Sequence, residues 1–326
     1  IAPSTQLAAF YKKAYTWPSR PGEISITDIK DTDEAVAIDF ADDGPDPQGT
    51  PVNLTYTVYY GILEVLDALY MPQQSTGEVL VVRDEYLLLR TNLEERFAKK
   101  PRYWAVVVTG HPGIGKTMFL IYLLLYRLEH KRPTAVQVTS DLYYIFDERG
   151  VTAFRLDQYS SRLPGCWALV DSNQYVIVPC APLTSRAKYV VLTTPPEPKR
   201  WKAWLKQGGG ELMVSELPAT LEIAAIAKEL GLDPKVARRW AEKRGQSMRQ
   251  IIELLEAEEG YETKVETDAE TASDAVWASP QKLSTMLSDV QSLSSTGSAV
   301  VFLRPVMKHD HRLPGIARDR PPGGYL

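Results

Sequence analysis

The sequence is poor in the residues that cross-link a chain or coordinate metals, and it lacks long apolar runs. Among its 326 residues are two cysteines, Cys166 and Cys180, and four histidines. Both cysteines lie in apolar, strand-like runs, so we expect core residues in a reducing compartment rather than a disulfide or a metal pair. The longest apolar run, residues 118–125, is too short to span a bilayer. These absences argue against a disulfide scaffold and a helical membrane protein.

Positive charge is not in excess either. Lysine and arginine number 37 against 41 aspartate and glutamate, which gives a formal net charge of -4. This balance gives no support for a general nucleic-acid-binding surface. No secretory leader is visible, and a content of 44% hydrophobic and 24% charged residues is ordinary for a globular protein. We expect a soluble protein of the cytoplasm or nucleus with no membrane partner.

A strand, a glycine-rich turn and a helix follow one another from Trp104 to Leu128. Residues 104–109 are apolar and β-branched, which is typical of a strand buried on both faces. Residues 110–117 read Gly-His-Pro-Gly-Ile-Gly-Lys-Thr and match the G-x-x-x-x-G-K-[ST] pattern. A strongly apolar helix is predicted from Met118 onward. This order of elements is the one that a phosphate-binding loop requires.

The chemistry of such a loop assigns a role to each residue type. Glycines let the backbone approach an anion closely, and successive N–H groups cradle the β-phosphate at the positive end of the following helix. We expect Lys116 to reach the β- and γ-phosphate oxygens and the Thr117 hydroxyl to hold Mg²⁺. The predicted nucleotide-binding residues are Gly110, Pro112, Gly113, Ile114, Gly115, Lys116, Thr117 and Met118.

A second motif follows about fifty residues later. Residues 166–171 form an apolar run that ends in Asp171, the Walker B pattern, and another strand is predicted between the two motifs at 134–138. Asp171 is therefore the expected second protein ligand of Mg²⁺. The next residue is Ser172 where many such ATPases carry the glutamate that polarises water. Hydrolysis would then need another carboxylate, such as Asp141 or Glu148, or be slow.

Two polar positions are predicted to read the γ-phosphate. The strand at 189–192 ends in Thr193 and Thr194, and we expect Thr193, or Thr194 beside it, in the sensor 1 role. Arg249 follows a glycine step at 245–249 and is predicted at a helix N-terminus in the sensor 2 role. With Lys116 and Asp171, these are the residues expected to take part in catalysis.

The helices predicted at 221–258 admit two interpretations. Residues 226–240 resemble a helix-turn-helix, with glycine in the turn and Arg238 and Arg239 on the second helix, which would suit a nucleic-acid-binding regulator. Alternatively, the helices form the lid that follows an AAA+-type core. We favour the lid, because it directly follows the core and the chain is acidic overall.

Four regions are expected along the chain. They are an N-terminal extension at 1–77, a P-loop NTPase core at 78–207, a helical lid at 208–260, and an acidic linker and tail at 261–326 that includes His309 and His311. Within them we predict a buried apolar element at 54–69, a strand at 78–82, a helix at 83–98 and a β-hairpin at 143–154. The expected fold is α/β, a P-loop NTPase of the ASCE or AAA-like class with a parallel central sheet.

Three stretches together resemble the NTPase module of Crinkler and retrotransposon-hot-spot-type proteins, especially fungal ones. They are residues 113–120, residues 81–86 (Val-Val-Arg-Asp-Glu-Tyr) and residues 168–172, and the resemblance covers about residues 78–260. It implies an effector protein, since this module is often joined to a nuclease-like or kinase-like effector domain. No PD-(D/E)xK or kinase motif set is recognisable in this sequence.

The patterns together predict a Mg²⁺-dependent ATP-binding protein that hydrolyses ATP. ATP is preferred to GTP because no [NT]-K-x-D motif follows the core. A small-molecule P-loop kinase remains an alternative, as does the nucleic-acid-binding regulator. The sequence leaves open a homo-oligomer, with Arg186 or Arg200 as candidate arginine fingers, and a protein or nucleic-acid partner.

Overall fold

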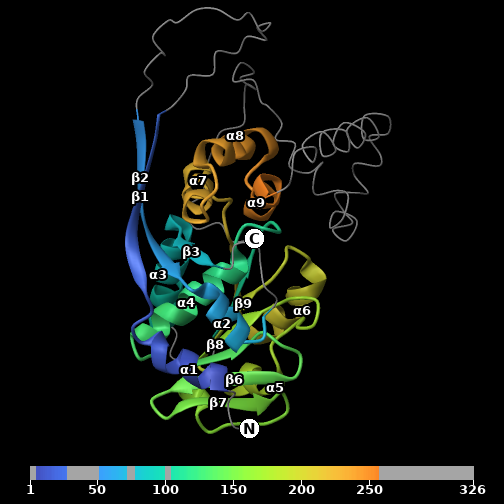
Figure 1. Cartoon of the computed structure of the whole chain (residues 1–326). Helices are drawn as coiled ribbons and strands as arrows, with labels where there is room; N and C mark the ends of the chain where they lie inside the picture. Colours follow the sequence, from blue (N-terminus) through green and yellow to red (C-terminus); the bar gives the residue numbers. More distant parts are fainter. Residues whose placement is uncertain (1–4, 28–50, 72–77, 100–103, 257–326) are drawn as a thin grey trace, which may run out of the picture.

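The structure, a computed structural model, describes residues 5–27, 51–71, 78–99 and 104–256. The acidic linker and tail expected at 261–326, with His309 and His311, lie outside the described residues. None of the helices in the described ranges combines the length and hydrophobicity needed to cross a lipid bilayer. Figure 1 shows a sheet covered by helices, a further group of helices above it, and a long β-ribbon beside both.

A seven-stranded sheet forms the centre of the molecule, in the order β10-β4-β9-β8-β5-β6-β7. Five neighbouring strands, β10 to β5 in that order, are parallel, and β6 and β7 add the predicted antiparallel hairpin at one edge. The mostly parallel sheet confirms the expected α/β class. The strands are β4 (Trp104–Thr109), β5 (Thr134–Gln137), β6 (Leu142–Asp147), β7 (Gly150–Arg155), β8 (Trp167–Asp171), β9 (Tyr189–Thr193) and β10 (Glu211–Val214).

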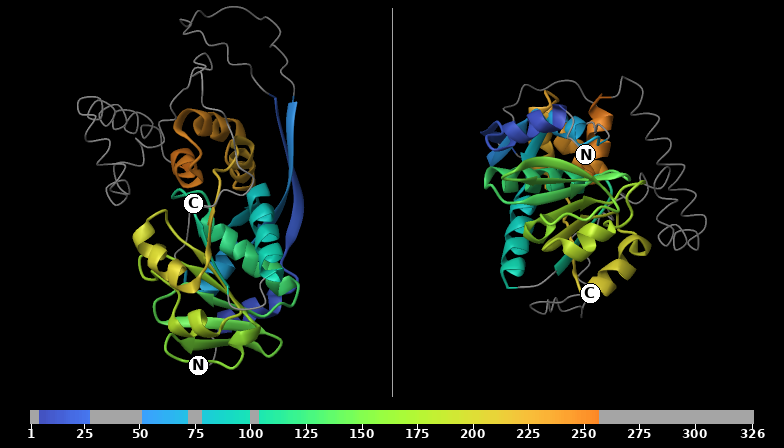
Figure 2. Two further views of the ribbon diagram at one scale, coloured as in Figure 1. Left: turned by 180° about the vertical axis from the view of Figure 1, so that it is seen from behind. Right: turned by 90° about the horizontal axis from the view of Figure 1, so that it is seen from below.

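Successive side chains of each buried strand point to opposite faces of the sheet and pack in two separate apolar layers. In β4, Val106 and Val108 pack beneath α1 to α4, whereas Ala105 and Val107 pack on the opposite face beneath α5 and α6. Helices therefore cover both faces of the sheet (Figure 2). They are α1 (Thr5–Ala14), α2 (Ile62–Ala68), α3 (Asp84–Ala98), α4 (Lys116–Glu129), α5 (Ala181–Arg186) and α6 (Pro198–Gly208), with a 3₁₀ turn at Leu163–Gly165.

A second, antiparallel sheet joins the core to the lid. It contains β1 (Ser19–Thr27), β2 (Pro51–Tyr60) and β3 (Val79–Val82). Val58 and Val81 pack against the lid helices, whereas the neighbouring Tyr59 and Leu80 pack into the main core. The single apolar element expected at 54–69 is therefore two elements, β2 and α2, separated by Gly61 with φ = 68°.

The region expected as the lid contains α7 (Thr220–Glu229), α8 (Pro234–Arg244) and α9 (Met248–Glu256), and these three helices are called the lid below. Ile223 and Ile226 of α7 pack on the β1–β2–β3 sheet, and Trp240 of α8 belongs to the same apolar cluster. Two expected boundaries differ from the structure. The main sheet extends past residue 207, since β10 pairs with β4. The helices that the structure describes before residue 78, α1 and α2, pack in the main core.

Candidate functional site

The loop between β4 and α4 requires its glycines for two reasons. Gly113 and Gly115 have φ values of 75° and 93°, in the left-handed region that glycine tolerates. A Cβ on Gly115 would lie 2.3 Å from Tyr86 Oη, and one on Gly113 would lie 2.6 Å from Ser247 Oγ. The loop is therefore held tightly between α3 and the lid.

Lys116 begins α4 and turns its ammonium group back over the loop. Nζ donates to the carbonyl oxygens of Gly110 and His111 at 2.7 and 2.6 Å. Burial lowers the pKa of Lys116 to about 8, and the nearby Asp171 carboxylate offsets part of this effect. Near neutral pH the side chain is a cation over the P-loop, held by two carbonyls that phosphate oxygens can replace.

Asp171 lies at the end of β8, beside the first turn of α4. The Thr117 hydroxyl is 3.3 and 3.2 Å from its two carboxylate oxygens, and the Thr193 hydroxyl donates to Oδ1 at 2.6 Å. Burial raises the pKa of Asp171, while the hydrogen bonds from Thr193 and Thr117 oppose the rise. Thr193 pairs with Asp171 across neighbouring parallel strands, so the sheet itself fixes this contact.

Thr194, rather than Thr193, presents an unused hydroxyl to the site. Its side chain is buried, and its Oγ1 has no hydrogen-bond partner among the described residues. A buried hydroxyl without a partner is costly, and Thr194 lines the cavity that contains Lys116. Of the two threonines expected at the end of β9, Thr194 is thus placed to meet a ligand, and Thr193 supports Asp171.

The lid reaches the P-loop through the start of α9. The backbone N–H of Arg249 donates to Gly113 O at 3.4 Å. The Arg249 side chain is exposed and lines the same cavity as Lys116, and its charge contributes to the lowered pKa of Lys116. The first turn of α9 therefore closes one side of the site.

These groups surround one cavity of about 290 Å³. Of the predicted site residues, Gly110, Ile114 and Thr193 do not line it. Four lining residues were given no role by the sequence analysis, because none carries a sequence signal: Met71 after α2, Asn173 after β8, Pro195 after β9 and Met248 in the lid. The lining consists of Met71, Pro112, Gly113, Gly115, Lys116, Thr117, Met118, Asp171, Ser172, Asn173, Thr194, Pro195, Met248 and Arg249.

The donor groups fit a magnesium ion that is shared with a nucleotide. Within the described ranges, no three His, Cys, Asp or Glu side chains gather as a metal site. Mg²⁺ does not need such a group, because it is commonly held by one or two carboxylates, substrate phosphates and water. The Thr117 hydroxyl lies 3.2 and 3.3 Å from the Asp171 carboxylate oxygens, close enough for both residues to bind one cation.

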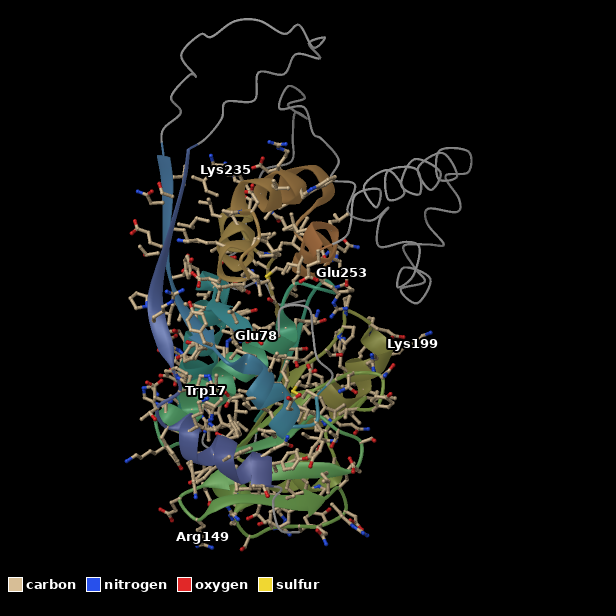
Figure 3. All side chains as sticks on the ribbon, viewed as in Figure 1. Trp17, Glu78, Arg149, Lys199, Lys235 and Glu253 are labelled. Atoms are coloured by element: carbon tan, nitrogen blue, oxygen red, sulfur yellow. The ribbon has the colours of Figure 1, made fainter. Side chains whose placement is uncertain are left out.

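The two candidate carboxylates lie away from this cavity. Asp141 and Glu148 line two separate cavities, and Arg149, next to Glu148, lies at the end of the molecule opposite Lys235 of the lid (Figure 3). The structure therefore places neither carboxylate at the P-loop. Arg200 donates to the carbonyl of Asn173, which lines the P-loop cavity, and Arg186 is exposed at the end of α5.

The strand order decides the fold. β9 lies between β4, which leads into the P-loop, and β8, which ends in Asp171. An additional strand between the two motif-bearing strands is the arrangement expected for the ASCE class. The core is a P-loop NTPase fold.

Comparison with solved structures finds several chains that resemble this one at low identity. The chain is similar to domain III of the replication initiation protein DnaA from Thermotoga maritima, with 16% identity over 53% of this chain and 82% of that one, at a TM-score of 0.35. It is similar to AMPPCP-bound DnaA from Aquifex aeolicus, with 15% identity over 58% of this chain and 68% of that one, at a TM-score of 0.36. It is also similar to the RuvB Holliday junction branch migration motor from Thermotoga maritima, with 14% identity over 58% of this chain and 63% of that one, at a TM-score of 0.33.

These likenesses are weak, so the fold assignment rests on the strand order and the P-loop. No protein-family model matches the sequence, and no curated protein matches it. The resemblance to Crinkler-type modules therefore stays a prediction.

Proposed function

We propose that this protein binds Mg-ATP between the P-loop and the lid and uses it as a slowly hydrolysed conformational switch in an effector-like protein. One observation carries the proposal: Lys116, Thr117, Asp171 and Arg249 line a single cavity. These are the four side-chain types that a triphosphate and its metal need. They come from the P-loop helix, a core strand and the lid.

Each residue has a distinct task in this proposal. The P-loop amides and Lys116 bind the β- and γ-phosphates. Thr117 and Asp171 would hold Mg²⁺, which when bound would neutralise charge on the phosphate oxygens. Thr194 and Arg249 contact the γ-phosphate, one from the core and one from the lid, so loss of that phosphate removes a link between them.

Slow turnover follows from the lining of the cavity. Among the described residues that line it, Asp171 is the only acidic one, and it is assigned to the metal. Ser172 follows it, and its hydroxyl donates to Ile177 O at 3.0 Å. A serine is not a base at neutral pH, so water must be activated without a dedicated carboxylate.

The test is calorimetric titration of the wild-type protein with Mg-ATP, Mg-ADP and Mg-GTP. We expect Mg-ATP to bind, Lys116→Ala to abolish binding, and Arg249→Ala to weaken ATP binding more than ADP binding. An absence of Mg-ATP binding, or equal binding by Lys116→Ala, would overturn the proposal. Phosphate release, measured separately, distinguishes a hydrolase from a small-molecule kinase.

The helix-turn-helix interpretation receives less support from the structure. Ala237, Trp240 and Ala241 of α8 are buried in the lid cluster rather than available to a groove of DNA. Arg238 Nε donates to Glu242 at 2.9 Å. Arg239 remains exposed, so charge reversal at this residue in a salt-dependent DNA-binding assay would test what is left of this alternative.

A further inference from the structure

The Val-Val-Arg-Asp-Glu-Tyr segment at 81–86 supports the P-loop from behind. It runs from the end of β3 into the first turn of α3. Arg83 and Tyr86 are each 1% exposed. Arg83 Nη1 donates to the carbonyl oxygen of Ile114 at 2.9 Å, and Tyr86 Oη donates to that of Gly115 at 2.8 Å. Two consecutive P-loop carbonyls are therefore held by side chains that do not line the cavity.

Planar peptide geometry gives these two bonds a consequence for the nucleotide. In a trans peptide the C=O of one residue and the N–H of the next point in opposite directions. Holding the carbonyls of Ile114 and Gly115 on the buried side therefore turns the N–H groups of Gly115 and Lys116 to the other side. Gly115 and Lys116 line the cavity, and these amides are the donors that a phosphate needs.

Arg83 also connects the loop to the lid. Its Nε donates to Glu222 Oε2 in α7 at 3.0 Å, and its Nη2 donates to Glu216 O, in the segment before α7, at 3.2 Å. Glu222 accepts in addition from the backbone N–H groups of Asp84 and Ala219 at 3.0 and 2.9 Å. Glu222 does not line the cavity, so it meets the P-loop through Arg83.

We propose that Arg83 and Tyr86 are positioning residues that orient the P-loop amides toward the nucleotide, and that Arg83 transmits the state of the loop to α7 through Glu222. This proposal rests on the proposed function. A nucleotide that shifts the peptide between Ile114 and Gly115 must also shift the guanidinium group of Arg83. The lid carboxylate bonded to that group then changes its position or its hydrogen bonds.

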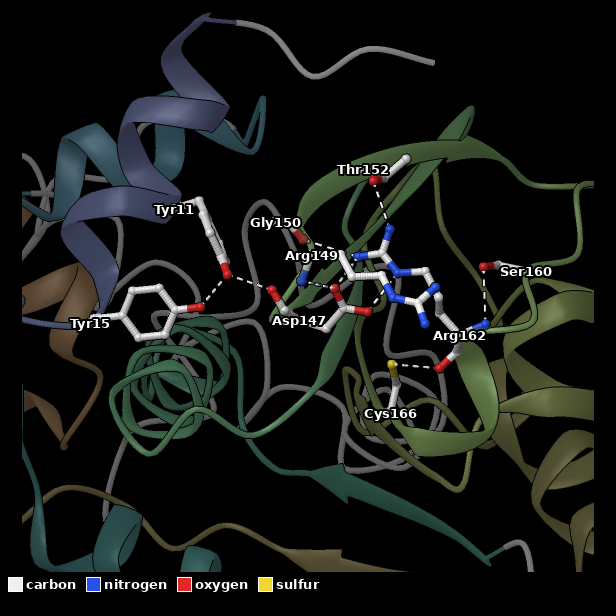
Figure 4. Close-up of polar contacts among 9 residues, drawn as sticks. All are labelled: Tyr11, Tyr15, Asp147, Arg149, Gly150, Thr152, Ser160, Arg162 and Cys166. Carbon is white, nitrogen blue, oxygen red and sulfur yellow. Dashed lines mark hydrogen bonds and ion pairs between the residues drawn. The ribbon is translucent and has the colours of Figure 1, made fainter.

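A purely structural role predicts something different, and the chain offers matched controls. Arg162, just before the 3₁₀ turn, is a comparable arginine that bonds the β6–β7 hairpin. Its Nε donates to Asp147 at 2.6 Å and its Nη2 to the carbonyl oxygen of Gly150 at 3.0 Å (Figure 4). Tyr143 is fully buried, and its hydroxyl donates to Gln158 O at 2.7 Å. Neither residue lines the P-loop cavity.

The experiment compares Arg83→Met, Tyr86→Phe and Glu222→Gln with the controls Arg162→Met and Tyr143→Phe in the full chain. Mg-ATP affinity is measured by calorimetry at a temperature where circular dichroism shows each variant folded. We expect the dissociation constant to rise about tenfold in Arg83→Met and about threefold to fivefold in Tyr86→Phe and Glu222→Gln. The controls should lower the denaturation midpoint and leave the affinity within about twofold.

Hydrogen exchange of α7 provides the second measurement. Saturating Mg-ATP should change the exchange of residues 220–229 in the wild type and in Tyr143→Phe, but not in Glu222→Gln. Should Arg83→Met fail to fold, Tyr86→Phe and Glu222→Gln decide the question. Unchanged affinity in both of these, with the wild type binding Mg-ATP, overturns this inference alone. Failure of the wild type to bind Mg-ATP is seen before any variant is made and overturns the proposed function as well.

Discussion

At the scale of single residues, burial shifts the pKa values of two oppositely charged groups at the P-loop, Lys116 and Asp171, in opposite directions. It lowers the pKa of Lys116 to about 8 and raises that of Asp171. A nucleotide needs the lysine protonated, because the ammonium group is what stabilises phosphate charge. The free protein is therefore ready to bind below pH 8 and progressively less so above it.

The first prediction is a pH dependence of nucleotide affinity. Since the pKa of Lys116 is about 8, its charged fraction falls as the pH rises through that value. The dissociation constant for Mg-ATP should then increase, approaching tenfold per pH unit well above the pKa. Calorimetry between about pH 7 and pH 10 measures this, with Lys116→Arg as the control that stays charged. A wild-type affinity that is flat across this range would contradict the prediction.

The second prediction concerns the residue after Asp171. Ser172 lines the cavity and is 6% exposed. Ser172→Glu introduces a carboxylate that can act as a general base, a group typically worth about 10²- to 10⁴-fold in rate. We expect steady-state phosphate release to rise at least about tenfold. The matched variant Ser172→Gln has the same size without the base and should stay at the wild-type rate; equal rates in the two variants would rule out a missing base.

What could be predicted from sequence at this scale depends on whether a residue acts locally. The P-loop residues follow one another in the chain, so Lys116 and Thr117 were found from spacing, and Asp171 from the strand before it. The hydroxyl of Thr194 could not be distinguished from that of Thr193, because their orientation depends on how β8 and β9 pair. Met71 contributes from a distant segment that carries no pattern.

At the scale of elements, α7 is tied down at both ends by carboxylates. Glu222 in its first turn binds Arg83, and Glu229 in its last turn accepts hydrogen bonds from Tyr60, Tyr56 and Arg20 at 2.6, 2.8 and 2.9 Å. The Glu229 side chain is 5% exposed. The hydrogen bonds of Glu229 therefore connect the lid to the β1–β2 ribbon.

The third prediction is that Glu229→Gln destabilises the protein in a pH-dependent way. Burial alone would raise the pKa of Glu229, but the three hydrogen bonds outweigh burial and lower it. The ionised Glu229 therefore stabilises the folded protein fully above pH 4.5, the ordinary pKa of a glutamate. This stabilisation is lost as the pH falls through the lower pKa that Glu229 has in the folded protein. We expect a loss of about 1–3 kcal/mol in the free energy of unfolding at neutral pH, shrinking in acid.

Urea denaturation at neutral pH and below about pH 4 measures this difference. Glu64→Gln is the control, since Glu64 pairs with Lys13 on the surface, where the two side chains are 57% and 41% exposed. Such exposed pairs contribute about 0–1 kcal/mol. A Glu229→Gln effect that is no larger than the Glu64→Gln effect would show that the tie to the ribbon adds little.

Element types were predictable wherever the pattern was long or regular. The hairpin of β6 and β7 follows from two apolar runs around a glycine turn, and α4 follows from its strongly apolar run after the P-loop. β10 was missed because four residues after three glycines look like the end of a domain, and its place depends on pairing with β4. The change from strand to helix within residues 54–69 could not be predicted, because the residues on both sides of it are apolar. Gly61, with its positive φ, makes the change possible.

At the scale of the whole molecule, the N-terminal segment links parts that lie far apart (Figure 1). Phe10 of α1 packs edge-on against Phe146 of β6 at a centroid distance of 5.7 Å. The β1–β2 ribbon packs on the lid, and Met71 lines the nucleotide cavity. The described residues before residue 78 thus pack against both the NTPase core and the lid.

The fourth prediction tests that integration. Phe10 is 3% exposed and also packs edge-on against Trp17. Phe10→Ala should lower the free energy of unfolding by about 3–5 kcal/mol, as for other buried aromatic side chains. Leu88→Ala, at a position that is 56% exposed, should stay within about 0.5 kcal/mol. Equal midpoints for the two variants in urea denaturation would show that α1 folds independently of the core.

The two carbonyl bonds of Lys116 also bear on how quickly the protein captures its ligand. The ammonium group is 2.7 and 2.6 Å from the oxygens of Gly110 and His111, so both contacts must break before the lysine can reach an incoming phosphate. Capture then has two stages, an encounter followed by rearrangement of the lysine. At high nucleotide concentration the observed association rate would level off at the speed of that rearrangement instead of rising with collision frequency.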